Sequence, residues 1–248
     1  MTDLAKTDFV PGGGAHAGPT GWARNAAGEW MIGGRALSDI VASVGSTPCY
    51  LYDRARLSTR VGELRAALPR ELRIHYAMKA NPMPALVCHM AGLVDGIDVA
   101  SGGELRIALD TGMAPAHISF AGPGKSDREL HQAVAAGILV NIESFREVGV
   151  LARAGVALGR PARVAVRVNL PFELRASGMK MSGGARPFGV DAECVPELLR
   201  EVASAGLAFE GFHLFAGSRK PPPRATVEGA TPSKGIGLGR LGQPPPTP

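Results

Sequence analysis

Short apolar segments alternate with helical patterns along most of the chain. Six segments have the length and apolar character of buried strands, and the first four recur about every 20 residues. They are residues 73–78, 96–100, 117–121, 138–142, 163–169 and 210–215. Apolar residues at helical spacing lie around them, for example Leu57, Val61, Leu64 and Leu68. Strands that alternate with helices predict a parallel sheet.

The starts of three predicted helices share one polar pattern. A serine directly follows a predicted strand, and a glutamate follows three residues later, which is the spacing of a capping box. The pairs are Ser101 with Glu104, Ser126 with Glu129, and Ser144 with Glu147. Because each pair directly follows a predicted strand, the three pairs support repeated strand–helix units.

Two architectures fit this rhythm: a (β/α)8 barrel and an open doubly wound sheet. The first strand is not followed by Gly-x-Gly-x-x-Gly, so the usual dinucleotide-binding signature is missing. A closed barrel of this kind needs about eight strands. With six predicted, we expect an incomplete α/β barrel.

The two ends of the chain differ from the middle. Residues 1–46 are weakly patterned, with a short strand expected near 29–32 and a helix from Leu37, and a β-prone run follows at 49–52. Residues 219–248 hold eight prolines, five glycines and no aromatic residue, which predicts a disordered tail. We therefore divide the chain into residues 1–46, a barrel portion at 47–218, and the tail.

Charge and cysteine usage exclude several classes of protein. The formal net charge of the chain is +5. Residues 219–248 hold five basic residues and one acidic residue, so the remainder carries 22 basic and 21 acidic groups. This balance excludes a nucleic-acid-binding surface. Three distant cysteines, with no ligand spacing, predict neither a disulfide framework nor a metal site. Without a signal peptide or a membrane-spanning run, we expect a soluble, cytoplasmic protein.

Chemistry in a barrel is expected where the parallel strands end. Those positions hold Lys79, Asp98, Arg167 or Asn169, and residues 213–218. A lysine that is partly desolvated near another cation can act as an amine nucleophile. By position alone, however, an ordinary surface lysine at a strand end explains Lys79 better.

Five ordered segments resemble the diaminopimelate and ornithine decarboxylase family, over residues 47–218. They are residues 75–82 (HYAMKANP), 98–105 (DVASGGEL), 167–169 (RVN), 188–191 (FGVD) and 211–218 (GFHLFAGS). The resemblance implies an alanine-racemase-like barrel and pyridoxal phosphate as cofactor. It is nearest to the subgroup associated with bacterial exosortase and exopolysaccharide systems. A racemase of the related barrel family fits these motifs less well.

The resemblance also assigns roles to residues. Lys79 would bind pyridoxal phosphate as a Schiff base, and Asp98 would lie near the cofactor ring. Arg167 would contact the region of the ring oxygen. Gly217 and Ser218 would help bind the phosphate, which suits a glycine-rich turn. Full-length relatives are expected to be homodimers that act on a small amino acid with a basic or second amino-acid head.

Two departures from the family pattern leave alternatives open. Phe215 stands where the family commonly has a histidine stacked on the cofactor ring, and His213 lies two residues earlier on the same face of the strand. Phe215 can stack but cannot donate a proton. The family's later barrel strands and C-terminal β-domain have no counterpart here, and residues 1–46 would pack on that domain. A decarboxylase by ancestry, a non-catalytic cofactor-binding protein and an inactive fragment all remain possible readings.

Overall fold

The computed structural model describes residues 22–169 and 187–215. The chain divides into two compact units, one up to Leu72 and one from Arg73. The predicted disorder of residues 219–248 lies outside the described residues. The expected division after residue 46, and the packing of residues 1–46 on a further domain, stay predictions.

The first unit contains a small antiparallel sheet and two helices. Its elements are β1 (Ala23–Arg24), β2 (Trp30–Ile32), β3 (Arg35–Ala36), α1 (Leu37–Val44) and α2 (Arg54–Ala67). The strand and the helix expected in this region are therefore confirmed. The β-prone run at 49–52 forms no strand, and Tyr50 is 91% exposed. Apolar character alone does not make a strand where no neighbouring strand offers hydrogen bonds.

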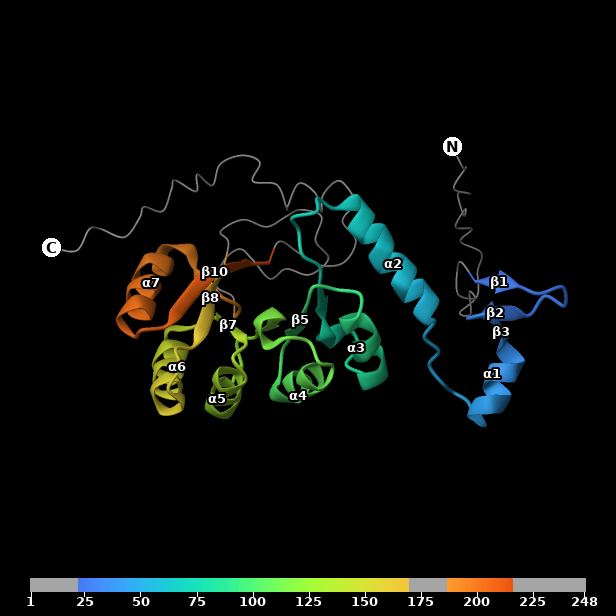
Figure 1. Ribbon diagram of the computed structural model, residues 1–248, viewed down its shortest axis with the longest axis horizontal. Coiled ribbons are helices and arrows are strands. Elements are labelled where there is room, and N and C mark those ends of the chain that lie inside the picture. Colours follow the sequence, from blue (N-terminus) through green and yellow to red (C-terminus); the bar gives the residue numbers. More distant parts are fainter. Residues whose placement is uncertain (1–21, 170–186, 216–248) are drawn as a thin grey trace. The chain divides into compact units, whose positions relative to one another are not determined.

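The second unit is built on a parallel sheet (Figure 1). Its strands are β4 (His75–Ala77), β5 (Gly96–Val99), β6 (Ile118–Phe120), β7 (Leu139–Ile142), β8 (Arg163–Asn169), β9 (Val190–Asp191) and β10 (Ala208–Leu214). The order is β10-β8-β7-β6-β5-β4, with the short β9 also paired to β8. All six predicted strands are present, which confirms the incomplete parallel barrel sheet.

Helices follow the strands and line up along one side of them, as Figure 1 shows for α3 to α6. The helical elements are η1 (Met78–Ala80), α3 (Pro84–Ala91), α4 (Gly102–Asp110), η2 (Pro115–His117), α5 (Asp127–Ala136), α6 (Phe145–Leu158), η3 (Ala192–Cys194) and α7 (Val195–Ser204). None of the described helices combines the length and apolar character needed to cross a membrane.

The core lies between these helices and one face of the sheet. Because side chains alternate along a strand, each of β5 to β8 sends every second residue to this face. Those residues are apolar and at most 2% exposed: Ile97, Val99, Ile118, Phe120, Val140, Ile142, Val164 and Val166. The other face is the inner face of the incomplete barrel.

The three predicted capping boxes have different outcomes. Ser126 and Glu129 form a complete box at the start of α5. Ser101 caps α4, but Glu104 accepts its bond from Ala100 N rather than from the serine. Ser144 makes no capping bond. The third prediction is therefore wrong, because Glu147 is engaged in the buried contacts described below.

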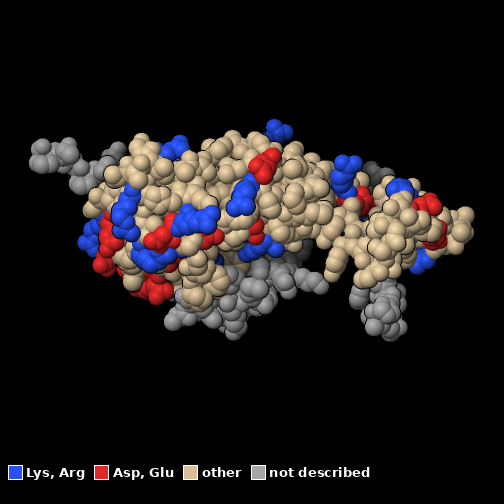
Figure 2. Space-filling view, turned by 90° about the horizontal axis from the view of Figure 1, so that it is seen from below, with Lys and Arg blue, Asp and Glu red and all other residues tan. Residues whose placement is uncertain are grey.

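The outer surface of the helices is a solvated face. Figure 2 shows lysine and arginine interspersed with aspartate and glutamate over this side of the molecule. Mixed charge of this kind is normal on the exposed face of helices that bury their other side.

The edge strand β10 is expected to promote self-association. Among the described residues it pairs with β8 alone, and Phe212 (39%) and Leu214 (52%) are exposed on it. Such an edge offers unpaired backbone groups and apolar surface to another chain. Replacing both residues by lysine should reduce self-association at neutral pH, measured by sedimentation velocity.

Val156→Lys is the matched control, because Val156 is 85% exposed on α6, away from a sheet edge. It should leave the distribution of species unchanged. Equal effects of the β10 and α6 substitutions would contradict an edge-specific association.

Candidate active site

A row of hydrogen-bonded polar side chains crosses the inner face of four neighbouring strands. His75 Nδ1 lies 2.9 Å from Asp98 Oδ1, which also accepts a 2.7 Å bond from Ser119 Oγ. Ser119 Oγ in turn accepts a 3.4 Å bond from Asn141 Nδ2. The parallel register sets Ala77 beside Asp98 and Asp98 beside Ser119, so consecutive strands supply these partners. The inner face of this sheet is therefore polar, whereas its other face is apolar.

Asp98 is the most strongly engaged member of this row. Burial opposes its charge, but hydrogen bonds from His75 and Ser119 outweigh that effect and lower the pKa of the Asp98 carboxyl. Hydrogen bonds to an ionised carboxylate favour the ionised form. Asp98 is therefore a stable negative charge at the end of β5, as expected for a residue that supports a cationic or electron-poor group.

Arg167 lies two residues before the C-terminal end of β8 and is held by a buried carboxylate. Its Nη1 donates to both oxygens of Glu143, at 2.9 and 3.0 Å, and both side chains are at most 7% exposed. The guanidinium carbon also lies 4.9 Å from the ring centre of Phe188 and 5.9 Å from that of Phe215. These distances are within the range of cation–π attraction. The position of the Arg167 head group is thus defined by one anion and two aromatic rings.

Lys79 lies just beyond the end of β4, in the single turn η1. Met78 anchors this turn because its side chain is fully buried, while Lys79 is exposed. Within residues 22–169 and 187–215, no group forms a hydrogen bond with the Lys79 amine. The lysine follows Ala77, the register partner of Asp98, by two residues. An accessible amine therefore stands at the strand end next to the one that carries Asp98.

His213 is the register partner of Arg167 across β10 and β8. Burial, and then the charge of Arg167, lower the pKa of the His213 imidazole. Its Nδ1 is buried and has no hydrogen-bond partner among the described residues. Phe215 is the last described residue of this segment, and the predicted phosphate contacts Gly217 and Ser218 lie outside the described residues.

Sequence reasoning missed four residues of this interior: Ser119, Asn141, Glu143 and the buried Lys125. A signal was available for Glu143, because it directly follows the predicted strand 138–142, as a carboxylate at a strand end. Ser119 and Asn141 interrupt apolar strands at inward positions, which is a weaker signal. Lys125 directly precedes the predicted helix cap Ser126, and only the fold shows that its side chain is 1% exposed and paired with Glu147.

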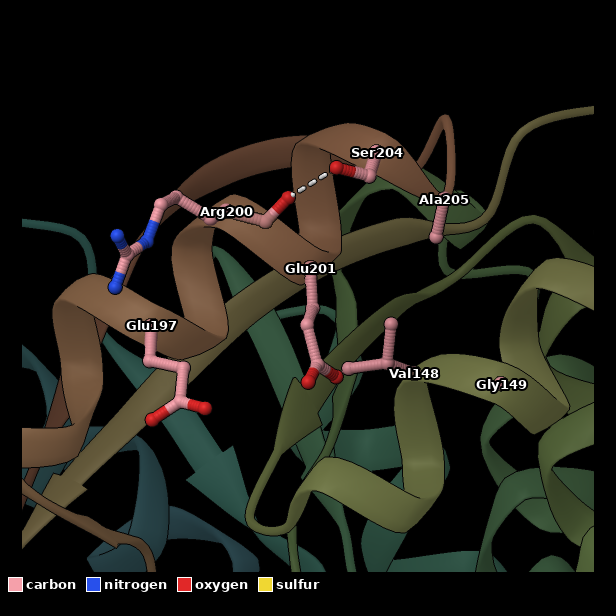
Figure 3. A pocket seen from close by; sticks show the side chains of 7 residues that line it. All are labelled: Val148, Gly149, Glu197, Arg200, Glu201, Ser204 and Ala205. Atoms are coloured by element: carbon pink, nitrogen blue, oxygen red, sulfur yellow. Dashed lines mark hydrogen bonds between the residues drawn. The ribbon is translucent and has the colours of Figure 1, made fainter.

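An open groove between α6 and α7 lies apart from these strand ends. Figure 3 shows Val148 beside Glu201, and the bond from Ser204 Oγ to the carbonyl of Arg200. The groove is lined by Val148, Gly149, Glu197, Arg200, Glu201, Ser204 and Ala205. Since none of these belongs to a strand end, the groove is a junction of two outer helices and not the candidate site.

Asp98 should make the stability of the second unit depend on acid. A lowered pKa in the folded state adds stability that is complete above the unfolded pKa, about 3.9, and is lost as the pH falls through the folded pKa. In urea unfolding, the advantage of the unaltered protein over Asp98→Asn should be constant at neutral pH. It should shrink as the pH drops below about 4. A difference that stays constant down to the lowest pH would contradict this assignment.

Comparison with known proteins gives this geometry a family. Residues 54–235 match the model of the "Pyridoxal-dependent decarboxylase, pyridoxal binding domain". Diaminopimelate decarboxylase of Aquifex aeolicus is 38% identical over 202 residues, 77% of this chain and 46% of that protein. The enzyme of the same name from Zymomonas mobilis is 34% identical, over 74% of this chain and 45% of that protein. The chain thus spans about half the length of these relatives.

Solved structures agree with the sequence matches. Diaminopimelate decarboxylase from Helicobacter pylori, complexed with L-lysine, has a TM-score of 0.69 at 27% identity, covering 78% of this chain and 50% of that one. The enzyme from M. jannaschii, also in complex with L-lysine, has a TM-score of 0.69 at 27% identity, over 82% and 49%. The parallel sheet with polar strand ends is thus that of a known barrel, and the chain belongs to the family of pyridoxal-dependent decarboxylases.

Proposed function

We propose that this chain binds pyridoxal phosphate through Lys79 and is the cofactor-binding part of an amino-acid decarboxylase. The observation that carries the proposal is the pair of neighbouring strand ends on which the Lys79 amine follows β4 and the Asp98 carboxylate ends β5. Both lie in the segment that matches the pyridoxal-binding domain. The family match indicates pyridoxal phosphate as the cofactor.

The residues present fit this group. Pyridoxal phosphate is an aromatic aldehyde with an anionic phosphate, so it requires an amine, cationic or N–H donors, and a surface against which a ring can lie. Lys79 supplies an accessible amine, and Arg167 supplies a fixed cation flanked by Phe188 and Phe215. The buried Nδ1 of His213 supplies a further hydrogen-bonding atom.

When bound, the cofactor supplies an electron sink for the electron pair left behind as a carboxylate departs as carbon dioxide. The chain's own residues have the simpler tasks of holding and orienting. Lys79 would bind the aldehyde, Asp98 would provide a fixed negative charge, and Arg167 would provide a fixed positive one. By the family resemblance, Gly217 and Ser218 would contact the phosphate. Phe215 offers an aromatic face 5.9 Å from the Arg167 guanidinium carbon but no hydrogen-bonding atom, whereas His213 has one in its Nδ1.

The substrate, partner and location belong to the same proposal. Two relatives are named for diaminopimelate and two solved structures contain L-lysine, which supports an amino acid with a second amino or basic group. A homodimer is expected for the complete enzyme, in the cytoplasm. The association with exosortase and exopolysaccharide systems stays a prediction, which the neighbouring genes would test.

The amine of Lys79 should carry the cofactor. Purified full chain, incubated with pyridoxal phosphate and reduced with borohydride, should yield a single pyridoxyl-labelled peptide containing Lys79, identified by mass spectrometry. The reason is accessibility at the strand end, since Lys79 is exposed whereas Lys125 is buried.

Lys79→Arg is the control, because it keeps the positive charge but forms no stable adduct under these conditions. Loss of the label in this variant supports the assignment. A label that persists on a different lysine would overturn it.

The chain alone should release no carbon dioxide from diaminopimelate, ornithine, lysine or arginine, even with added cofactor. The chain spans about half the length of the decarboxylases it resembles. Among the described residues β4 and β10 each pair on one side only, so the sheet that carries the site is not closed into a barrel there. Labelling of Lys79 without turnover would support a non-catalytic cofactor-binding protein or an inactive fragment. Turnover of any of these amino acids, measured as released carbon dioxide, would contradict both, and racemisation without release would favour the racemase.

A further inference from the structure

A closed ring of hydrogen bonds and one ion pair includes Glu143, the carboxylate that holds Arg167. Gly122 N donates to Glu143 Oε1, and Glu143 N donates to Glu147 Oε2 at 2.8 Å. Glu147 Oε1 lies 3.1 Å from Lys125 Nζ, which donates to the carbonyl of Gly122 at 2.6 Å. The ring therefore returns to its starting residue.

The ring is buried, and buried charges are costly to keep. Side-chain exposure is 1% for Lys125, 2% for Glu147 and 1% for Glu143. Burial raises the pKa of the Glu147 carboxyl despite the neighbouring Lys125 charge, which is a measure of that cost. Apolar side chains of similar size often replace such pairs without loss of stability. Stability alone is thus a poor explanation for this ring.

The ring fixes the position of Glu143, and Glu143 in turn holds groups near the C-terminal end of β8. Besides Arg167, its carboxylate accepts a bond from Gly189 N at 3.2 Å. At Gly189, whose φ is +75°, an added Cβ would lie 2.9 Å from the carbonyl oxygen of Arg167, so this segment approaches β8 as closely as its backbone allows. Phe188, the preceding residue, then lies against the Arg167 guanidinium. A shift of Glu143 would therefore move both the anion and one ring that hold Arg167.

We propose that Glu147 is a positioning residue for the cofactor site: paired with the buried Lys125, it fixes the backbone of Glu143, which in turn holds Arg167. Glu147 acts through Glu143 and touches no reacting atom. The essential contact is the bond from Glu143 N to Glu147 Oε2. This inference rests on the proposed function, because Arg167 is there assigned to cofactor binding.

Two double variants test the contact without leaving an unpaired buried charge. Lys125→Met with Glu147→Gln removes both charges and retains an acceptor for Glu143 N. Lys125→Met with Glu147→Met removes both charges and the acceptor. The glutamine variant should bind pyridoxal phosphate within about twofold of the unaltered chain, and the methionine variant about tenfold more weakly, in a spectroscopic titration. Equal affinities of the two variants would overturn the proposal.

A second readout needs no cofactor. Modification of Arg167 by phenylglyoxal, followed by peptide mass spectrometry, should be slow in the unaltered chain and the glutamine variant but faster in the methionine variant. If the unaltered chain binds no cofactor, the proposed function fails, and this readout alone decides the positioning role. Equal protection of Arg167 in both double variants would then overturn it.

Arg163→Met with Glu210→Met is the matched control. It removes an ion pair from the opposite end of the same sheet, where Arg163 Nη2 lies 2.9 Å from Glu210 Oε2. This variant should lower the melting temperature yet leave cofactor affinity and the labelling of Arg167 unchanged. If this control changed cofactor affinity or the labelling of Arg167 as much as the methionine variant does, general destabilisation would explain both effects. That result would overturn the proposal.

Discussion

The alternation of side chains along parallel strands is the constraint on which this structure depends. One face of the sheet is apolar and covered by helices, so every polar residue at an alternate position is sent to the other face. There a polar side chain needs a hydrogen-bond partner, and the parallel register brings one from the next strand, as for Asp98 and Ser119. The same register that buries the core therefore assembles the polar interior.

The charged groups of this interior differ in how they are held. Asp98 is fixed by neutral or titratable donors and stays partly exposed, whereas Arg167 is buried against Glu143. A buried arginine without its carboxylate would be strongly destabilising, because the charge would lose both water and its partner. The head group of Arg167 thus cannot change its position without moving Glu143, which also binds the backbone at Gly122 and Gly189. A rigid cation is useful to a site that must orient an anionic ligand.

Most of the fold could be predicted from the sequence, because its strands are short apolar segments at regular spacing. All six expected strands are present, and Lys79, Asp98 and Arg167 stand at or just beyond strand ends. The third capping box failed for a reason that local sequence does not contain. Glu147 is drawn to Lys125, whose position after β6 becomes its neighbour only in the folded sheet. For the same reason the sequence did not predict the contacts of Arg167. They come from Glu143, Phe188 and Phe215, which lie in three separate segments of the chain.

By the resemblance to the decarboxylase family, Phe215 stands where a histidine is common, just beyond the end of β10. The ring of Phe215 lies near the Arg167 guanidinium, where an aromatic face is favourable and a protonated imidazole would be repelled. Burial, and then the charge of Arg167, lower the pKa of the His213 imidazole two residues earlier, and its Nδ1 has no partner among the described residues. A buried polar atom without a partner is costly, so it favours any bound group that can hydrogen-bond to it. In this chain the aromatic surface and the hydrogen-bonding atom, which a single histidine can combine, are therefore divided between Phe215, just beyond β10, and His213 on β10.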